Sequence, residues 1–199
     1  MSCNHEECSI THTNEFENTK SLYSCINKNK IECYNYNSNY PIENCIKPYS
    51  ERHNSSYLES DCDEQLIIRI PFLNRVKISS ISFNGTYEYS PSMIKLYKNH
   101  NVLTFDEICD RKEEEKIEIN NDPLYDLMYP LRVSKFNNID EILIYIPENY
   151  GASVTRINYI NFYGEKTKSR HGIVDCVYES RAVLGDHKIP DLINRKMGL

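Results

Sequence analysis

Within residues 57–83, apolar and polar side chains alternate from Leu66 onward, and this alternation constrains the fold more than any other feature of the chain. Period-2 spacing over five or more residues predicts a strand with one buried face. The alternation pauses at residues 73–75 and then resumes, so we interpret the stretch as a β-hairpin that turns there. In its first half every second residue is large and apolar: Leu66, Ile68, Ile70 and Phe72.

The alternation does not explain four acidic side chains that open the same stretch: Glu59, Asp61, Asp63 and Glu64. Oxygen-rich loops can coordinate Ca²⁺, but the EF-hand pattern and its turn glycine are missing here. We therefore expect no metal at these residues. The simpler prediction is an exposed acidic loop that leads into the hairpin.

Further strands are predicted at residues 31–36, 93–99, 139–147 and 156–165. The stretch 139–147 is apolar on both faces, which indicates a central strand covered on each side. Thr104 is placed to cap one helical turn, whereas the charged run 111–116 predicts a solvated linker. With roughly seven to nine short strands and hardly any helical periodicity, the chain is predicted to be all-β, a β-sandwich or jelly roll with short helical turns.

The length of 199 residues suits one domain with tails. We expect an irregular N-terminal tail over residues 1–20, a β-sandwich domain over 21–180 and an irregular C-terminal tail over 181–199, with both tails flexible. In the first tail, Cys and His side chains at positions 3, 5, 8 and 12 could bind a soft metal ion, but their spacing matches no structural zinc site.

The net charge of −6 argues against a nucleic-acid or anionic-membrane partner, because phosphate binding depends on clustered Lys and Arg. No stretch approaches the roughly 20 apolar residues that a membrane-spanning helix requires, and the first residues lack the apolar core of a signal peptide. We expect the protein to be a monomer. We expect it to be located in the cytoplasm and also in the nucleus.

The chain shows no pattern typical of catalysis or of cofactor binding. There is no GxSxG elbow and no glycine-rich phosphate loop, and each histidine stands without a partner at fixed spacing. Because the chain shows no secretion signal, we expect its eight cysteines to be free thiols in a reducing compartment. None of them forms a CxxC pair, which argues against a thioredoxin-type redox centre and a zinc-knuckle ligand pair. We expect no enzyme and no cofactor.

Several segments, taken in order, resemble the PITH domain: YLESDCDEQLIIRIPF, VKISSISFNG, SPSMIKLYKN, SKFNNIDEILIYIPENYGA and INYINFYGE. The resemblance spans residues 21–165. Beyond it, SRHGIVDCVYESRAVLGDH resembles the extension of stand-alone members of the family and not the short tail of the relative that is fused to thioredoxin.

The resemblance implies a galactose-binding-like jelly roll that docks on the regulatory particle of the 26S proteasome and carries out no catalysis. Because sandwich folds usually place recognition on loops, we expect the contact surface to combine the acidic loop with two loop tips. The predicted contact residues are Glu59, Asp61, Asp63, Glu64, Tyr97, Lys98, Tyr150 and Gly151.

Two other functions stay open. A β-sandwich with 16 tyrosines could bind a small ligand or a carbohydrate in the manner of a lectin. A cysteine-based redox enzyme is the third hypothesis, and the missing CxxC pair argues against it.

Overall fold

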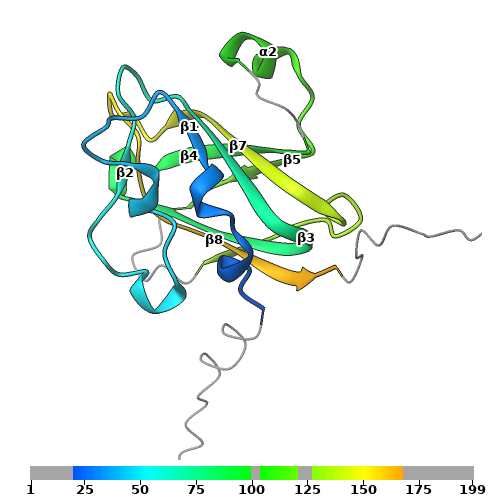
Figure 1. The fold of residues 1–199 in the computed structure, drawn as a ribbon. Coiled ribbons are helices and arrows are strands. Elements are labelled where there is room, and N and C mark those ends of the chain that lie inside the picture. The colour runs from blue at the N-terminus through cyan, green and yellow to red at the C-terminus, as the bar shows by residue number, and fades with distance from the viewer. Residues whose placement is uncertain (1–19, 100–103, 121–126, 168–199) are drawn as a thin grey trace, which may run out of the picture. The chain divides into compact units, whose positions relative to one another are not determined.

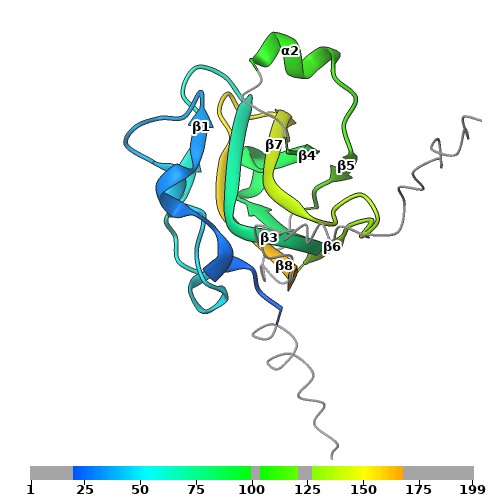
Figure 2. The same ribbon diagram turned by 45° about the vertical axis from the view of Figure 1, so that its right-hand side comes forward.

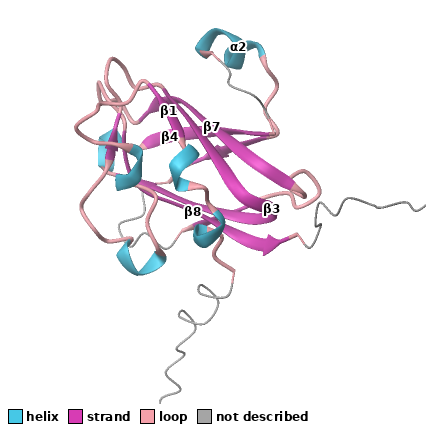
Figure 3. Cartoon of the chain, in the orientation of Figure 1, coloured by secondary structure: helices cyan, strands magenta, loops and turns pink. Residues whose placement is uncertain are grey.

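Antiparallel strands make up most of the structure, a computed structural model that describes residues 20–99, 104–120 and 127–167 (Figures 1 and 3). Among these residues, helix is confined to α2 and to five single 3₁₀ turns, so the all-β prediction is confirmed. The 3₁₀ turns are η1 Tyr23–Cys25, η2 Lys28–Lys30, η3 Ile42–Asn44, η4 Tyr49–Glu51 and η5 Tyr87–Tyr89. The other elements are β1 Glu32–Tyr34, β2 Leu58–Glu59, β3 Leu66–Gly85, β4 Pro91–Lys98, α2 Phe105–Asp110, β5 Glu115–Glu118, β6 Met128–Pro130, β7 Ile139–Asn149 and β8 Arg156–Lys166.

The long strand β3 belongs to both layers of the sandwich. Its residues 66–71 pair with β7 and continue the order β5-β4-β7-β3-β1. Its residues 76–85 pair with β8 and continue the order β2-β8-β3-β6. In Figure 2 the strand curves from one layer into the other. The two ends of β3 therefore lie at the same end of the sandwich, and its bend lies at the opposite end.

The predicted hairpin over residues 57–83 is wrong, because the two halves of β3 pair with other strands and not with each other. The pairing register shifts between Pro71 and Val76, where residues 73–75 bulge out of the sheet. None of those three residues has a positive φ, which the tight two-residue turns of hairpins require. The backbone thus stays extended through the bend, and each half buries its apolar face in a different layer.

One hydrophobic core fills the space between the layers, and a smaller one covers the outer face of the first layer. In β7, Ile142, Ile144 and Ile146 point into the main core, whereas Leu143 and Tyr145 join the outer cluster. The prediction of a strand covered on both faces is confirmed. Fully burying each such side chain stabilises the fold by about 1.5–3 kcal/mol.

The short helix α2 forms where its cap was predicted. The Thr104 side chain accepts a hydrogen bond from the Glu107 backbone N–H, and the Glu107 carboxylate accepts one from the Thr104 N–H. Ile108 is buried on the outer face of the first layer. The linker predicted over residues 111–116 is partly wrong, because β5 begins at Glu115 and pairs with β4.

The predicted tails, the four N-terminal Cys and His positions and the extension beyond residue 167 lie outside the described residues, except for Lys20. The domain boundaries at 21 and 180 therefore stay predictions. Among the described residues, no helix is long and apolar enough to cross a membrane.

Candidate functional site

Four loop segments meet at the end of the sandwich where β7 stops and β8 starts. They are residues 35–40, 60–65, 86–90 and 149–155, which we call the loop end, on the left of Figure 1. Backbone hydrogen bonds join them: Asp61 N–H donates to the Asn35 carbonyl (2.9 Å), Ser60 N–H to the Thr155 carbonyl (3.0 Å) and Tyr150 N–H to the Ser90 carbonyl (3.1 Å). Segments far apart in the sequence thus form one surface.

The acidic loop within this surface is firmly held. Asn35 has a positive φ of 64°, a conformation that Asn tolerates better than most residues. Its side-chain amide donates to Asp63 Oδ1 (2.6 Å) and to the Gln65 carbonyl (2.7 Å), while its Oδ1 accepts from the Cys62 N–H (3.1 Å). Asp61 and Asp63 are exposed, as predicted. Glu64 is half-buried, and its carbonyl accepts a hydrogen bond from the Thr155 hydroxyl.

Glu59 corrects the prediction of a fully exposed acidic loop. It lies in β2 and is only 8% exposed, because its carboxylate accepts a 2.7 Å hydrogen bond from Arg156 Nε at the start of β8. The guanidinium of Arg156 also lies 4.1 Å from the ring centre of Tyr89 and 4.9 Å from that of Tyr57. The Glu59 carboxylate is therefore used inside the fold and is not available to a partner.

Tyr97 and Lys98 do not lie at a loop tip. Both belong to β4, and Tyr97 is completely buried beneath α2, where its hydroxyl donates to the Ile108 carbonyl (3.4 Å). This burial raises the pKa of Tyr97 to about 12. Lys98 donates to the Lys135 carbonyl (2.8 Å) and pairs with Glu114 near the opposite end of the sandwich from the acidic loop.

Tyr150 and Gly151 do form a loop tip and belong to the loop end. Tyr150 is 47% exposed, while its hydroxyl donates to the Ile119 carbonyl (2.5 Å) and fixes the ring. Gly151 has a φ of +112°, a conformation that favours glycine. The structure brings this tip together with the acidic loop.

The sequence interpretation missed two exposed tyrosines at the loop end. Tyr36 is 41% exposed and lies across from Ser60, next to the acidic loop. Tyr87 is 77% exposed at the start of η5, where its φ is +45°. Their loop compositions, rich in Asn and Ser, could have signalled exposure, but nothing in the sequence placed them beside the acidic loop.

A cavity of about 350 Å³ lies between η1 and residues 43–56, outside the four segments of the loop end. Tyr23, Ile31 and Ile46 line it together with the ammonium group of Lys47, which donates to the carbonyls of Asn54 (2.9 Å) and Ser56 (2.7 Å). Burial lowers the pKa of Lys47. The volume is at the lower limit for small-molecule sites in proteins.

The described residues also show how possible metal ligands and the thiols are arranged. No three or more His, Cys, Asp or Glu side chains there lie close enough together to hold a metal ion. The five described cysteines are free. Burial raises the pKa of Cys33 to about 12 and also raises that of Cys45, so neither is a reactive thiolate at neutral pH.

Sequence comparison finds one family over most of the chain. The profile of the PITH domain matches residues 12–182. PITH domain-containing protein CG6153 of Drosophila melanogaster is 35% identical over 189 residues, which cover 94% of this chain and 89% of the relative. PITH domain-containing protein 1 of Homo sapiens is 34% identical over 171 residues, 84% of this chain and 81% of the relative.

Comparison with solved structures finds galactose-binding-like sandwiches. The family 32 carbohydrate-binding module of Clostridium perfringens NanJ, solved in complex with galactose, aligns with a TM-score of 0.52 at 10% identity, covering 72% of this chain and 98% of that chain. A fucolectin from striped bass serum aligns with a TM-score of 0.51 at 11% identity, covering 74% and 49%. At such identities the likeness establishes the fold alone, and it confirms the predicted fold class.

Proposed function

The chain belongs to the PITH domain family, and from this premise we propose that it is a non-enzymatic interaction module that docks on the regulatory particle of the 26S proteasome. The observation that carries the proposal is the family match over residues 12–182, since the resemblance to this family implies proteasome docking. Docking is a property of a surface, so it requires no catalytic group.

The loop end is the surface that suits this function best. Its segments come from four separate parts of the chain, and they expose aromatic rings beside carboxylates, as protein contact sites often do. Because hydrogen bonds fix these segments in the free protein, little conformational entropy is lost on binding.

The test is affinity capture of proteasomes from cell extract with the full chain as bait. We expect the wild-type protein to recover regulatory-particle subunits, identified by mass spectrometry. The double variant Asp61→Asn and Asp63→Asn should recover much less. Both carboxylates are exposed, and Asn at position 63 keeps the Oδ1 acceptor that the Asn35 amide and the Gln65 N–H use, so the variant should keep its fold.

The matched control removes two exposed carboxylates of α2, Asp106→Asn and Asp110→Asn, and should recover as much as the wild type. No recovery by the wild-type protein would refute proteasome docking. If the wild type and the Asp61 and Asp63 variant recover equal amounts of proteasome, the contact surface lies outside the loop end.

Small-ligand binding is the second candidate, and the cavity beside Lys47 is the observation that favours it. A thermal-shift screen that includes galactose and N-acetylgalactosamine tests this function. A rise in melting temperature that Lys47→Met abolishes would support it, whereas a screen without any rise would count against it.

A further inference from the structure

The charge of the loop end has a single sign. Its four segments contain four carboxylates and no Lys, Arg or His. Arg156, which directly follows the last of the four segments, is already paired with Glu59. The four carboxylates belong to Asp61, Asp63, Glu64 and Glu88.

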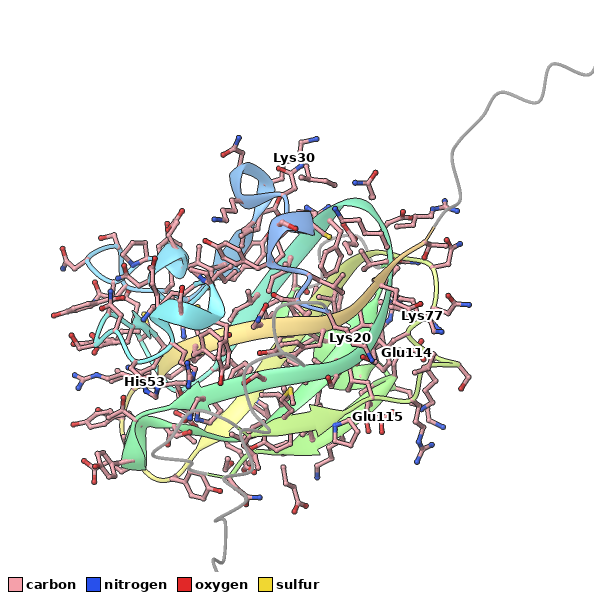
Figure 4. All side chains as sticks on the ribbon, turned by 90° about the horizontal axis from the view of Figure 1, so that it is seen from below. Lys20, Lys30, His53, Lys77, Glu114 and Glu115 are labelled. Atoms are coloured by element: carbon pink, nitrogen blue, oxygen red, sulfur yellow. The ribbon has the colours of Figure 1, made fainter. Side chains whose placement is uncertain are left out.

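The opposite end of the sandwich carries both signs of charge. There Glu114 lies 3.6 Å from Lys98, and Glu115 lies 3.7 Å from Arg132. In Figure 4 the side chains of Glu114, Glu115 and Lys77 lie at the same end of the domain. A cationic partner is therefore attracted to the loop end in preference to the opposite end.

Exposed tyrosines are a second, independent feature of this surface. Seven large hydrophobic side chains are exposed among the described residues, and Tyr36, Tyr87 and Tyr150 of the loop end are three of them. Tyrosine offers a broad apolar ring that loses little entropy on binding, and its face attracts cations. A partner that suits this surface therefore combines positive charge with a planar group that can stack.

The described part of the fold already contains an example of this combination. Arg156 stacks its guanidinium on Tyr89 while it donates a hydrogen bond to Glu59. Arginine does this better than lysine, because its guanidinium is planar, more weakly hydrated and able to bind a carboxylate with two parallel hydrogen bonds. The exposed carboxylates and rings of the loop end offer the same two groups to an arginine from outside.

We propose that the loop end binds an arginine-bearing segment of a partner protein, with the guanidinium paired to Asp61 or Asp63 and stacked on an exposed tyrosine ring. The inference rests on the proposed docking function and adds to it the chemistry of the partner. Tyr36 is the exposed tyrosine whose backbone pairs beside the acidic loop, since it lies across from Ser60, the residue before Asp61.

The test titrates ¹⁵N-labelled full-length protein with the peptide acetyl-Gly-Arg-Gly-Arg-Gly-amide and with its lysine and citrulline analogues. We expect the arginine peptide to shift amide signals of the loop end. The lysine peptide should bind several-fold more weakly, and the uncharged citrulline peptide should produce no shifts at matched concentration. Affinity should fall as salt is added, because exposed charges are screened.

Substitutions at the loop end test which residues bind the arginine peptide. Asp61→Asn with Asp63→Asn should weaken the arginine peptide by about tenfold, as expected when a hydrogen bond to a charged group is lost. Tyr36→Ala should weaken binding of the arginine peptide by a smaller factor. It should also reduce the difference in affinity between the arginine and lysine peptides. The Asp106→Asn and Asp110→Asn control should leave the affinity unchanged.

The inference is overturned if lysine and arginine peptides bind equally, if the loop-end variants bind like the wild type, or if the shifts lie elsewhere. The outcome is separate from that of proteasome capture. Arginine-peptide binding without proteasome recovery would refute the proposed function and support the surface chemistry. Proteasome recovery that neither the Asp nor the Tyr36 substitution reduces would overturn the inference and leave docking in place.

Discussion

At the scale of single residues, the environment of each carboxylate and thiol decides its role. Glu59 and Asp61 are two positions apart, yet one is buried in an ion pair with Arg156 and the other faces solvent. Among the thiols, Cys33 is held in apolar surroundings, whereas Cys62 is exposed and the Asp61 carboxylate beside it raises the pKa of its thiol. Neighbours and burial matter more here than residue type.

Substituting Glu59 should destabilise the protein, because its carboxylate acts inside the fold and not in contact with a partner. Glu59→Ala leaves the Arg156 guanidinium without its carboxylate partner, so we expect the free energy of unfolding to fall by about 1–3 kcal/mol. Asp61→Ala should change it by less than about 0.5 kcal/mol, because its side chain is exposed. Urea unfolding measures both values, and equal losses would contradict the burial of the Glu59 pair.

Removing the Asp61 charge should make Cys62 more reactive. The carboxylate raises the pKa of the thiol, so Asp61→Asn should lower it and increase the thiolate fraction at pH 8. We expect several-fold faster alkylation of Cys62 by iodoacetamide, followed by mass spectrometry. The exposed Cys109 is the internal control, with an unchanged rate, and Cys33 should stay unlabelled in the folded protein. An unaltered rate at Cys62 would exclude this electrostatic effect.

At the scale of elements, the close pairing of β3 with β8 leaves no space for a side chain at Gly164. A Cβ atom there would lie 1.9 Å from the Lys77 carbonyl oxygen, at the point where the register shifts by one residue between Ile78 and Ser80. Because the obstacle is backbone on a neighbouring strand, a side chain could fit only if the two strands moved apart.

Gly164→Ala should therefore lower the free energy of unfolding by about 3 kcal/mol or more. Gly151→Ala is the matched control, because its Cβ would meet nothing within 4 Å and only its φ of +112° is unfavourable. We expect the control to lose about 1 kcal/mol. Thermal and urea unfolding measure which variant loses more free energy of unfolding. A smaller loss for Gly164→Ala than for Gly151→Ala would contradict the close approach of the strands.

The capping box of α2 makes a second prediction at this scale. Thr104→Ala removes the hydrogen bond to the Glu107 N–H, so α2 should lose about 1 kcal/mol. Amide hydrogen exchange of residues 105–110 should become faster, with β7 and β8 unaffected. Rescue by Thr104→Ser separates the cap from a general loss of stability.

At the scale of the whole molecule, charge and edge strands oppose self-association. The chain carries a net charge of −6, and the sheet edges among the described residues are short: β5 is charged at three of its four positions, and β6 ends in Pro130. Charged side chains and proline at an edge prevent the addition of another strand.

The full chain should therefore behave as a monomer. Size-exclusion chromatography with light scattering should give 23.4 kDa at micromolar concentration. Twice that mass, independent of salt, would show that a surface outside these edges joins two copies.

The sequence alone determined the strand content, the positions of β4, β7 and β8, the cap of α2 and the family, because these follow from local periodicity, local hydrogen bonding and the order of motifs. The passage of β3 through both layers and the burial of Glu59 and Tyr97 follow from packing between distant segments. The burial of Glu59 depends on its ion pair with Arg156, and the burial of Tyr97 depends on its contact with α2. The alternation of side chains along the sequence specifies neither partner. The gathering of Asp61, Tyr36 and Tyr150 on one surface has the same physical cause, since contacts between distant segments form only when the layers pack.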